Sequence, residues 1–386
     1  MGVSDSIVLS LVLCGISLFA ALFLLRRDGL SLGLPIAYLF ALCLEHVPGA
    51  YAHLVRPDLF ITTEHVALGI WRAAVGSLCF VVGLSIARAG RPRIAGRAAF
   101  RPPQSPFVAP TRLNQRFWFF CLFAGWLFVY GLSPLRGIPS LGALIEKGGA
   151  IWMLGVMLGL RDAAARSNVR ACMLWLVLLS VYPVLMLILG GFLSYGSAAA
   201  IITLSVLAVS VRSIWRVLIG TAVIVALGLT IFVNYFVARD HLRSVLWSGA
   251  GFEARVQTVV GVFSRIEPLN LDNDQHATSL DARLNQNYFA GLAAERLDQG
   301  WVDFLQGQSF YEAVIAVIPR AVWPDKPVVA GSGTLVRDMT GLELSTETSW
   351  GVGQVMEFYM NFGWPSLVIG FALLGWLIGR LDWKAA

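Results

Sequence analysis

Charged residues are scarce in this chain. Asp, Glu, Lys and Arg together make up 13% of its 386 residues, whereas 57% are apolar, and its mean hydropathy is +0.71. This composition is typical of a membrane protein with several spanning helices. The net charge of +6 comes from arginines in short segments between apolar runs. That pattern indicates cytoplasmic loops and argues against nucleic-acid binding.

Cysteine is also scarce, and its positions argue against two kinds of site. The five cysteines lie in or beside apolar runs: Cys14, Cys43, Cys79, Cys121 and Cys172. None falls in the long polar segment and none forms a CxxC pair, which argues against a disulfide framework and a cysteine metal or redox centre. His46, His53 and His65 are expected on one side of the membrane but in different turns, so we expect no metal and no other cofactor.

Two further features are missing. The N-terminus has no basic region and no small-residue cleavage site before or after its first apolar run, so we expect that run to remain as a membrane anchor. No internal repeat is visible, which argues against transporter folds built from inverted halves.

Nine apolar runs approach the length of a membrane-spanning helix, which is roughly 20 residues. They cover residues 7–25, 30–46, 66–87, 117–132, 149–160, 172–190, 192–211, 217–237 and 354–379. The sequence therefore predicts an all-α, polytopic inner-membrane protein. Its expected parts are an eight-helix bundle over 1–237, a large extracytoplasmic loop with short helices over 238–353, and a last span with a cytoplasmic tail over 354–386.

The arginines alternate between the loops and so predict orientation. They follow the first, third, fifth, seventh and ninth runs, and residues 88–116 alone contain seven arginines and no acid. Cytoplasmic loops of membrane proteins are enriched in Arg and Lys. We therefore expect the C-terminus in the cytoplasm, and the N-terminus and the 238–353 loop outside.

The 238–353 loop is the longest polar segment and carries most of the candidate site residues. Apolar residues recur at helical spacing from Asp281 to Leu297, which predicts one helix there. Residues 304–318 form a second apolar segment that is too short to span, and we expect it to be interfacial or re-entrant. Residues 318–327 then hold three prolines, which fix φ and remove backbone donors, so they predict a rigid bend.

Polar residues open the last apolar run. Glu357, Tyr359 and Asn361 enter a segment that is otherwise suited to a membrane, where an ionisable side chain is costly and usually functional. Glu357 and Asn361 are four residues apart and so share one helix face, which we expect to look toward the bend. Two interpretations stay open: Glu357 takes part in chemistry, or it pairs with an arginine and seats the loop.

Four blocks in this order resemble the Wzy-type polymerases of bacterial O-antigen and exopolysaccharide repeat units. The blocks are Ala282-Arg283-Leu284 and residues 304–310, 318–327 and 357–363. The Pro-Arg and Trp-Pro-Asp-Lys-Pro block and the Glu-x-Tyr-x-Asn-Phe-Gly block carry most of the resemblance, and Arg296 with Gly307 fits a further Arg-to-Gly spacing of the family. The resemblance covers residues 283–375, about a quarter of the chain.

The resemblance implies glycosyl transfer at the outer face of the inner membrane, from undecaprenyl diphosphate to a new lipid-linked oligosaccharide unit. Cations would hold the diphosphate, because arginine pairs with phosphate oxygens in a bidentate manner. The candidates are Arg320 and Lys326 first, then Arg283, Arg296, Arg255 and Arg265. Glu357 is the first candidate for the base and Asp325 the second. Trp323 and Tyr359 would stack on sugar rings or anchor the chain at the interface, and Asn361 would help to bind the substrate.

The expected partners are the lipid-linked oligosaccharide and membrane lipid, and the resemblance adds a flippase and a chain-length regulator of the same pathway as candidates. Three alternatives remain open at this stage. A glycan ligase would use the same lipid-linked donor, a transporter or flippase would move it, and a non-catalytic scaffold would do neither. A transporter predicts ionisable or broken positions in the middle of paired spans, and the first eight runs are almost free of ionisable residues near their centres.

The predicted orientation can be tested with topology reporters. We expect alkaline phosphatase fused near residue 275 to be active, because that position should lie outside, and the same enzyme fused near residue 100 to be inactive. A cytoplasmic reporter with the reverse preference serves as the control. Activity of the cytoplasmic reporter alone at residue 275 would contradict the orientation.

Overall fold

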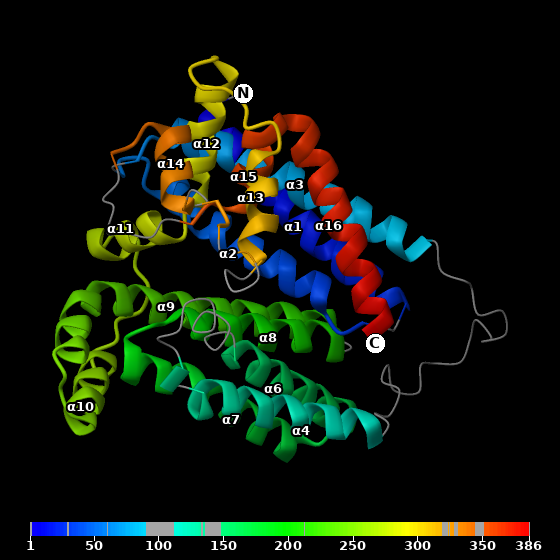
Figure 1. Cartoon of the computed structure of the whole chain (residues 1–386), viewed down its shortest axis with the longest axis vertical. Helices are drawn as coiled ribbons and strands as arrows, with labels where there is room; N and C mark the ends of the chain where they lie inside the picture. The colour runs from blue at the N-terminus through cyan, green and yellow to red at the C-terminus, as the bar shows by residue number, and fades with distance from the viewer. Residues whose placement is uncertain are drawn as a thin grey trace. The chain divides into compact units, whose positions relative to one another are not determined.

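A computed structural model describes residues 2–28, 31–59, 61–89, 112–132, 134–135, 148–211, 213–318, 323, 325–327, 331–343 and 351–385. Every regular element within these ranges is a helix (Figure 1), which confirms the all-α prediction for them. The chain forms two compact units. Unit 1 contains Met1–Leu24, Leu34–Arg91 and Asn270–Lys384, and unit 2 contains Leu25–Gly33, Pro92–Leu269 and Ala385–Ala386.

Unit 1 is built from long helices near both ends of the chain and from short helices that precede the last one. The long helices are α1 (Val3–Asp28), α2 (Leu34–Val55), α3 (Thr63–Ala89) and α16 (Trp364–Ala385). The short helices are α11 (Asp274–Arg283), α12 (Gln286–Asp298), α13 (Gln308–Val317), α14 (Ser332–Thr340) and α15 (Gln354–Phe362).

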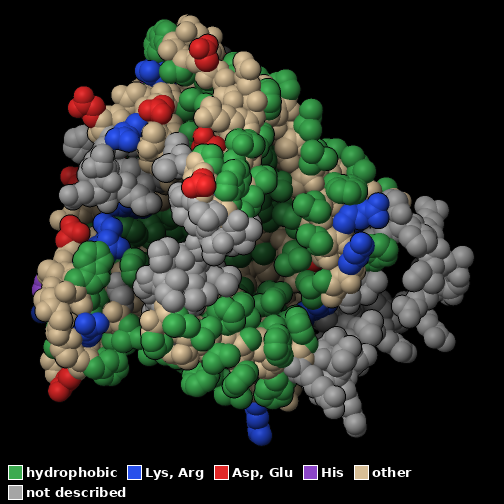
Figure 2. Space-filling view, viewed as in Figure 1, with side chains coloured by type: hydrophobic (Ala, Val, Ile, Leu, Met, Phe, Trp, Pro, Cys, Tyr) green, Lys and Arg blue, Asp and Glu red, His purple; other side chains and the backbone are tan. Residues whose placement is uncertain are grey.

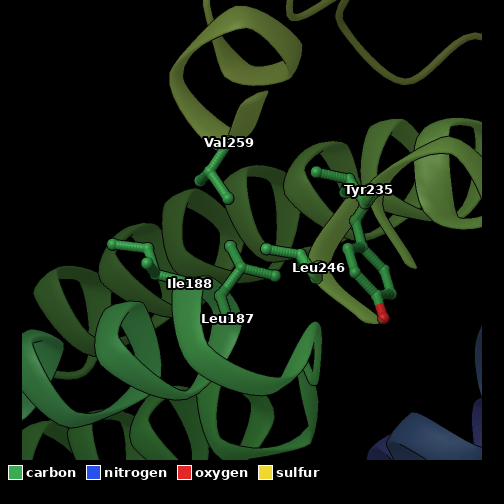
Figure 3. Packing of buried hydrophobic residues seen from close by; sticks show 6 residues of the cluster. Leu187, Ile188, Tyr235, Leu246 and Val259 are labelled. Atoms are coloured by element: carbon green, nitrogen blue, oxygen red, sulfur yellow. The ribbon is translucent and has the colours of Figure 1, made fainter. Parts of the chain in front are cut away.

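Unit 2 is the middle of the chain. Its elements are α4 (Arg112–Trp126), the π-helix η1 (Leu127–Gly131), α6 (Gly148–Ala165), α7 (Val169–Gly190), α8 (Ser194–Ser210), α9 (Ile214–Trp247) and α10 (Phe252–Phe263). One of its cores joins α7, α9 and α10, where apolar side chains from all three helices point toward one another (Figure 3). Residues 238–269 of the predicted loop thus belong to unit 2 and residues 270–353 to unit 1.

Six helices of the described residues are long and apolar enough to cross a membrane. They are Val3–Arg27, Leu34–Val55, Thr63–Ala89, Val169–Leu189, Ile214–Trp247 and Trp364–Ala385, and two shorter apolar helices cover Phe117–Gly131 and Ser194–Ser210. Apolar side chains also predominate on the visible surface over α16 and over the helices of unit 2 (Figure 2). These helices indicate a membrane protein, but the count of nine spans is not confirmed.

The last span differs from the prediction. Residues 354–379 were expected to form one helix, whereas the chain forms α15 and then α16, with a break at Gly363. Gly363 has φ 67° and ψ −140°, a conformation that is open almost only to glycine. Glu357 therefore lies in a short helix before the span and not inside the span.

The predicted helix over Asp281–Leu297 is also wrong, because it is two helices, α11 and α12. The carbonyl of Leu284 accepts a hydrogen bond from the backbone N–H of Gly49 in α2 at 3.1 Å. The Asn285 side chain donates back to Asp281 at 2.6 Å, a local bond that competes with helical geometry. Both bonds hold the chain out of the helix at this point.

Helix α12 packs directly against α3 because glycines remove the side chains between them. A Cβ placed on Gly69 would lie 2.0 Å from the carbonyl oxygen of Asn287, and one placed on Gly291 would lie 1.9 Å from that of His65. No larger residue fits at either position without moving a backbone. The segment that precedes the last span is therefore part of the packed unit 1.

A buried ion pair connects the end of α3 to the end of α16 in unit 1. The Arg88 guanidinium in α3 donates to Asp382 in α16 at 3.0 Å, and the two side chains are 3% and 0% exposed. The same carboxylate accepts the N–H of Leu34 at the start of α2 at 3.1 Å. Removing one partner of such a pair costs about 3–5 kcal/mol, so this contact fixes α2, α3 and α16 together.

Candidate functional site

Helix α15 carries three of the predicted site residues, on two different faces. Glu357 and Asn361 share one face, as expected from their spacing, and Tyr359 lies on the opposite face because two residues turn a helix by about 200°. The first face contacts the start of α13, and the second contacts α3, α12 and α16. We call these residues, with their partners Ser309, Arg72 and Asp298, the α15 cluster.

Asn361 fastens α15 to the loop that precedes α13. Its side chain is 0% exposed, and its amide donates to the Ser309 hydroxyl and to the Glu357 carbonyl, both at 2.7 Å. Its side-chain oxygen accepts the N–H of Gly307 at 3.0 Å. Every polar atom of the amide is thus used within the protein. The expectation that Asn361 binds substrate is therefore corrected to a structural role, since the side chain is fully buried and both of its N–H donors are used within the protein.

Glu357 is the partly buried carboxyl group of the α15 cluster. It is half-buried on the same face as Asn361, and burial raises the pKa of its carboxyl group, while the Ser309 hydroxyl that bonds to it opposes this shift. A raised carboxyl pKa moves toward the operating pH, which is what efficient proton transfer requires. Ser309 is itself 3% exposed, so the hydroxyl that orients this carboxylate is fixed.

On the opposite face of α15, a buried arginine collects partners from three other helices. Arg72 of α3 is 3% exposed, and it donates to Asp298 of α12 at 2.9 Å and to the Tyr359 hydroxyl at 3.2 Å. Tyr359 in turn donates to Asp298 at 2.7 Å. The guanidinium carbon lies 4.3 Å from the centre of the Tyr359 ring and 5.3 Å from that of Trp364. A buried cation needs such compensation.

Tyr359 is therefore not placed to stack on a sugar, and that expectation is corrected. Its side chain is 2% exposed, and burial, followed by the hydrogen bond to Asp298, raises the pKa of its phenol. The phenol thus stays protonated and donates to the Asp298 carboxylate. Its ring fills the space between Arg72 and Trp364, where an interior packing role explains it.

A chain of buried hydrogen bonds lies beside the α15 cluster and joins α2 to α11 and α12. It runs through Thr63, His53, Asp281, Asn285, Asn287 and His46, with distances between 2.6 and 3.1 Å. Separately, His65 bonds to Glu295 at 2.6 Å. The three histidines thus serve different partners, and no group of three or more His, Cys, Asp or Glu side chains in the described residues could hold a metal ion.

The described part of the proline bend lies at the far end of α13 from Glu357. The Lys326 ammonium donates to the carbonyls of Ile315, Ala316 and Ile318 at 3.2, 3.2 and 2.9 Å, and so caps the C-terminus of α13. Ser309, which contacts Glu357, lies at the N-terminus of α13. At 1.5 Å per residue, the two ends of this helix are separated by about 10 Å between Ser309 and the carbonyls that Lys326 caps. The Glu357 face therefore does not contact Lys326, and the part of the expectation that concerns Arg320 lies outside the described residues.

Of the other candidate residues in the bend, two are exposed and the third lies outside the described residues. Trp323 is 37% exposed, and Asp325 is exposed as well, so both remain accessible to a ligand. Arg320, the first candidate for the diphosphate, lies outside the described residues.

The secondary arginines are not gathered at one point. Arg283 ends α11 and Arg296 lies near the end of α12, with its guanidinium nitrogen 2.7 Å from the position that a Cβ on Gly341 would take, at the end of α14. Arg255 and Arg265 belong to unit 2. Arg255 donates to the carbonyls of Ala250 and Leu189 at 2.7 and 3.0 Å, and Arg265 is exposed just after α10.

Sequence reasoning missed Arg72, Asp298 and Ser309. Arg72 was visible as the single cation within the apolar run 66–87, and an ionisable residue there is a functional or structural signal by default. Its place near the end of the run hid its importance. Asp298 and Ser309 gave no signal in the sequence, because their partners are distant in the chain. Arg72 lies 226 residues before Asp298, and Glu357 lies 48 residues after Ser309. The contact between Ser309 and Glu357 also depends on how α15 is oriented.

Comparison with protein-family models, with curated proteins and with solved structures finds no match to this chain. The assignment of a function therefore depends on the residues described above.

The contacts around Arg72 can be tested by a double-mutant cycle. Tyr359→Phe removes one hydroxyl, and we expect a loss of about 1 kcal/mol in unfolding free energy. Combined with Asp298→Asn, its effect should not be additive, with a coupling of about 0.5–3 kcal/mol, because the three groups share hydrogen bonds. Unfolding in detergent, followed by circular dichroism, measures both values.

The control pairs Asp298→Asn with Tyr311→Phe, because Tyr311 is 63% exposed on another helix. These two changes should add. Strict additivity of Tyr359→Phe and Asp298→Asn would contradict the shared network.

Proposed function

We propose that this protein polymerises oligosaccharide repeat units that are linked to a lipid diphosphate, by glycosyl transfer at a bacterial inner membrane. The observation that carries the proposal is Glu357, a half-buried carboxyl group with a raised pKa in a short helix that leads directly into the apolar helix α16. That position suits an acceptor hydroxyl on a sugar attached to a membrane lipid. The resemblance of residues 283–375 to the Wzy-type polymerases gives the substrate class.

In the proposed reaction Glu357 removes the proton of the acceptor hydroxyl as the hydroxyl oxygen attacks the anomeric carbon of the donor sugar. A new glycosidic bond forms, and the bond between that carbon and the diphosphate oxygen breaks. The lipid diphosphate leaves with the electron pair. Ser309 orients the base by its hydrogen bond, and Asn361 holds Ser309 and α15 in register.

The leaving diphosphate needs cations in the transition state. Arg320 is the proposed residue, because it lies between Pro319 and a Trp-Pro pair, whose prolines restrict the backbone on either side of it. Lys326 contributes differently from the expectation, since it caps α13 and so fixes the segment that leads into Arg320. Trp323 and Asp325, both exposed, are the further residues of this segment that can meet a sugar.

The test is genetic and then biochemical. Deleting the gene should remove long glycan chains while single lipid-linked units remain, whereas loss of a flippase would remove the exported single units as well. Glu357→Gln should leave protein yield and thermal stability near those of the native protein and abolish long chains, because the amide keeps the shape but cannot accept a proton. Glu253→Gln is the matched control: it is the same change at an exposed position of α10.

The raised pKa of Glu357 predicts how the rate of chain extension depends on pH. Burial raises the Glu357 pKa above the usual glutamate value of about 4.3, so its ionised form is lost as pH falls through this higher value. The rate of chain extension in membrane vesicles should therefore decline on the acid side at a pH above the ordinary glutamate range. A stable Glu357→Gln protein that still makes long chains would remove Glu357 from the reaction.

A further inference from the structure

Two arginines of unit 2, Arg243 and Arg255, meet at the end of α7, and a third, Arg239, lies one turn before Arg243 on α9. Arg239 and Arg243 stand four residues apart on α9 and so share a face, and Arg255 lies in the first turn of α10. A Cβ on Gly191, just after α7, would lie 3.5 Å from the Cγ of Arg243, and Arg255 donates to the carbonyl of Leu189 at 3.0 Å. Arg243 and Arg255 thus meet at one turn, next to Leu246, a residue of the apolar core of α7, α9 and α10 (Figure 3).

No carboxylate neutralises these arginines within the described residues. None of the three takes part in an ion pair there, and Arg239 and Arg243 make no hydrogen bond. The nearby acids in sequence are Asp240, which is exposed, and Glu253, which accepts a hydrogen bond from Gln257 at 3.3 Å. The carbonyl end of α7 offers only a partial negative charge. Three like charges held together in this way favour an anionic ligand.

Aromatic side chains flank the same arginines. The Arg243 guanidinium carbon lies 5.0 Å from the centre of the Trp247 ring and 5.6 Å from that of Phe192, and Arg239 lies 5.7 Å from the Phe236 ring. Trp247 is 62% exposed and Phe192 47% exposed. Exposed aromatic rings beside arginines are typical of the boundary between the hydrocarbon and the head groups of a membrane.

The length of α9 places the arginines at that boundary. The helix has 34 residues and is therefore about 51 Å long, whereas the hydrocarbon core is about 30 Å thick. Residues 217–238 are free of charge and span about 33 Å. Arg239 is the first charged residue after this stretch, and α7 ends beside Arg243, one turn further along α9. A head group at this depth would meet Arg239, Arg243 and Arg255 together.

We propose that the cluster of Arg239, Arg243 and Arg255 binds the phosphate head group of an anionic membrane lipid. Each guanidinium has five donors, and those of Arg239 and Arg243 have no acceptor among the described residues, so they can hold phosphate oxygens in a bidentate manner. The lipid chains would lie along the exposed apolar residues of α9 that share the face of Arg239, Val225 and Leu218. This site is in unit 2 and does not depend on the proposed polymerase reaction.

The experiment uses native mass spectrometry of the full-length protein in detergent, with phosphatidylglycerol or phosphatidylcholine added. The native protein should retain phosphatidylglycerol in preference to phosphatidylcholine. The double variant Arg239→Gln/Arg243→Gln should lose affinity for phosphatidylglycerol roughly thirtyfold, the effect expected for two interfacial arginines. Arg166→Gln is the control, because this exposed arginine of unit 2 already pairs with Asp162 at 3.0 Å, and its affinity should not change.

Two further arms keep the result decisive. Arg239→Lys/Arg243→Lys keeps the charge and should retain most of the binding, which separates lost charge from lost folding. Geranylgeranyl diphosphate and inorganic pyrophosphate are added as competitors of bound phosphatidylglycerol. Displacement by geranylgeranyl diphosphate assigns the site to polyprenyl diphosphates within the same class of anionic lipid.

Three results would each overturn the proposal. They are equal retention of phosphatidylglycerol and phosphatidylcholine, an unchanged affinity of the Gln variant for phosphatidylglycerol, and displacement of phosphatidylglycerol by pyrophosphate as strong as by geranylgeranyl diphosphate.

Discussion

A buried arginine that must be neutralised is the constraint on which unit 1 depends. Arg72 lies inside a helix suited to a membrane, where an uncompensated charge costs several kcal/mol. Its partners come from α12, α15 and α16, namely Asp298, Tyr359 and Trp364. One guanidinium thus fixes helices that are up to about 290 residues apart in the chain. The segment before the last span is packed for this reason, and charged side chains gather over its short helices (Figure 2).

The position of Glu357 follows from the same contact. Tyr359 holds one face of α15 against Arg72, so the opposite face, with Glu357 and Asn361, must turn toward the start of α13. Asn361 completes this arrangement by bonding to Gly307 and Ser309. The carboxyl group is therefore partly desolvated by packing that is set two residues away on the other side of the helix. A structural cation and a candidate base are linked in this way without touching.

The sequence predicts those features that local patterns determine. Long apolar runs predict α2, α3, α7 and α9, and the spacing of Glu357 and Asn361 predicts their common face. It fails where the outcome depends on distant partners or on one backbone angle. Hydropathy is continuous through Gly363, so the break before α16 is invisible, and the Gly49 hydrogen bond that separates α11 from α12 is a tertiary contact. Lys326 looked like a free cation because nothing local indicates that it caps α13.

The most direct measurement is hydrogen–deuterium exchange of the full-length protein in detergent, read by mass spectrometry. If Arg72 and the glycine contacts hold the short helices in unit 1, the amides of α12 and α15 will exchange as slowly as those of the buried turns of α3 around Gly69. Residues 264–268, which are exposed after α10, supply the fast reference. Exchange of α12 and α15 at the rate of that reference would show that they form a loose loop, and would contradict the account.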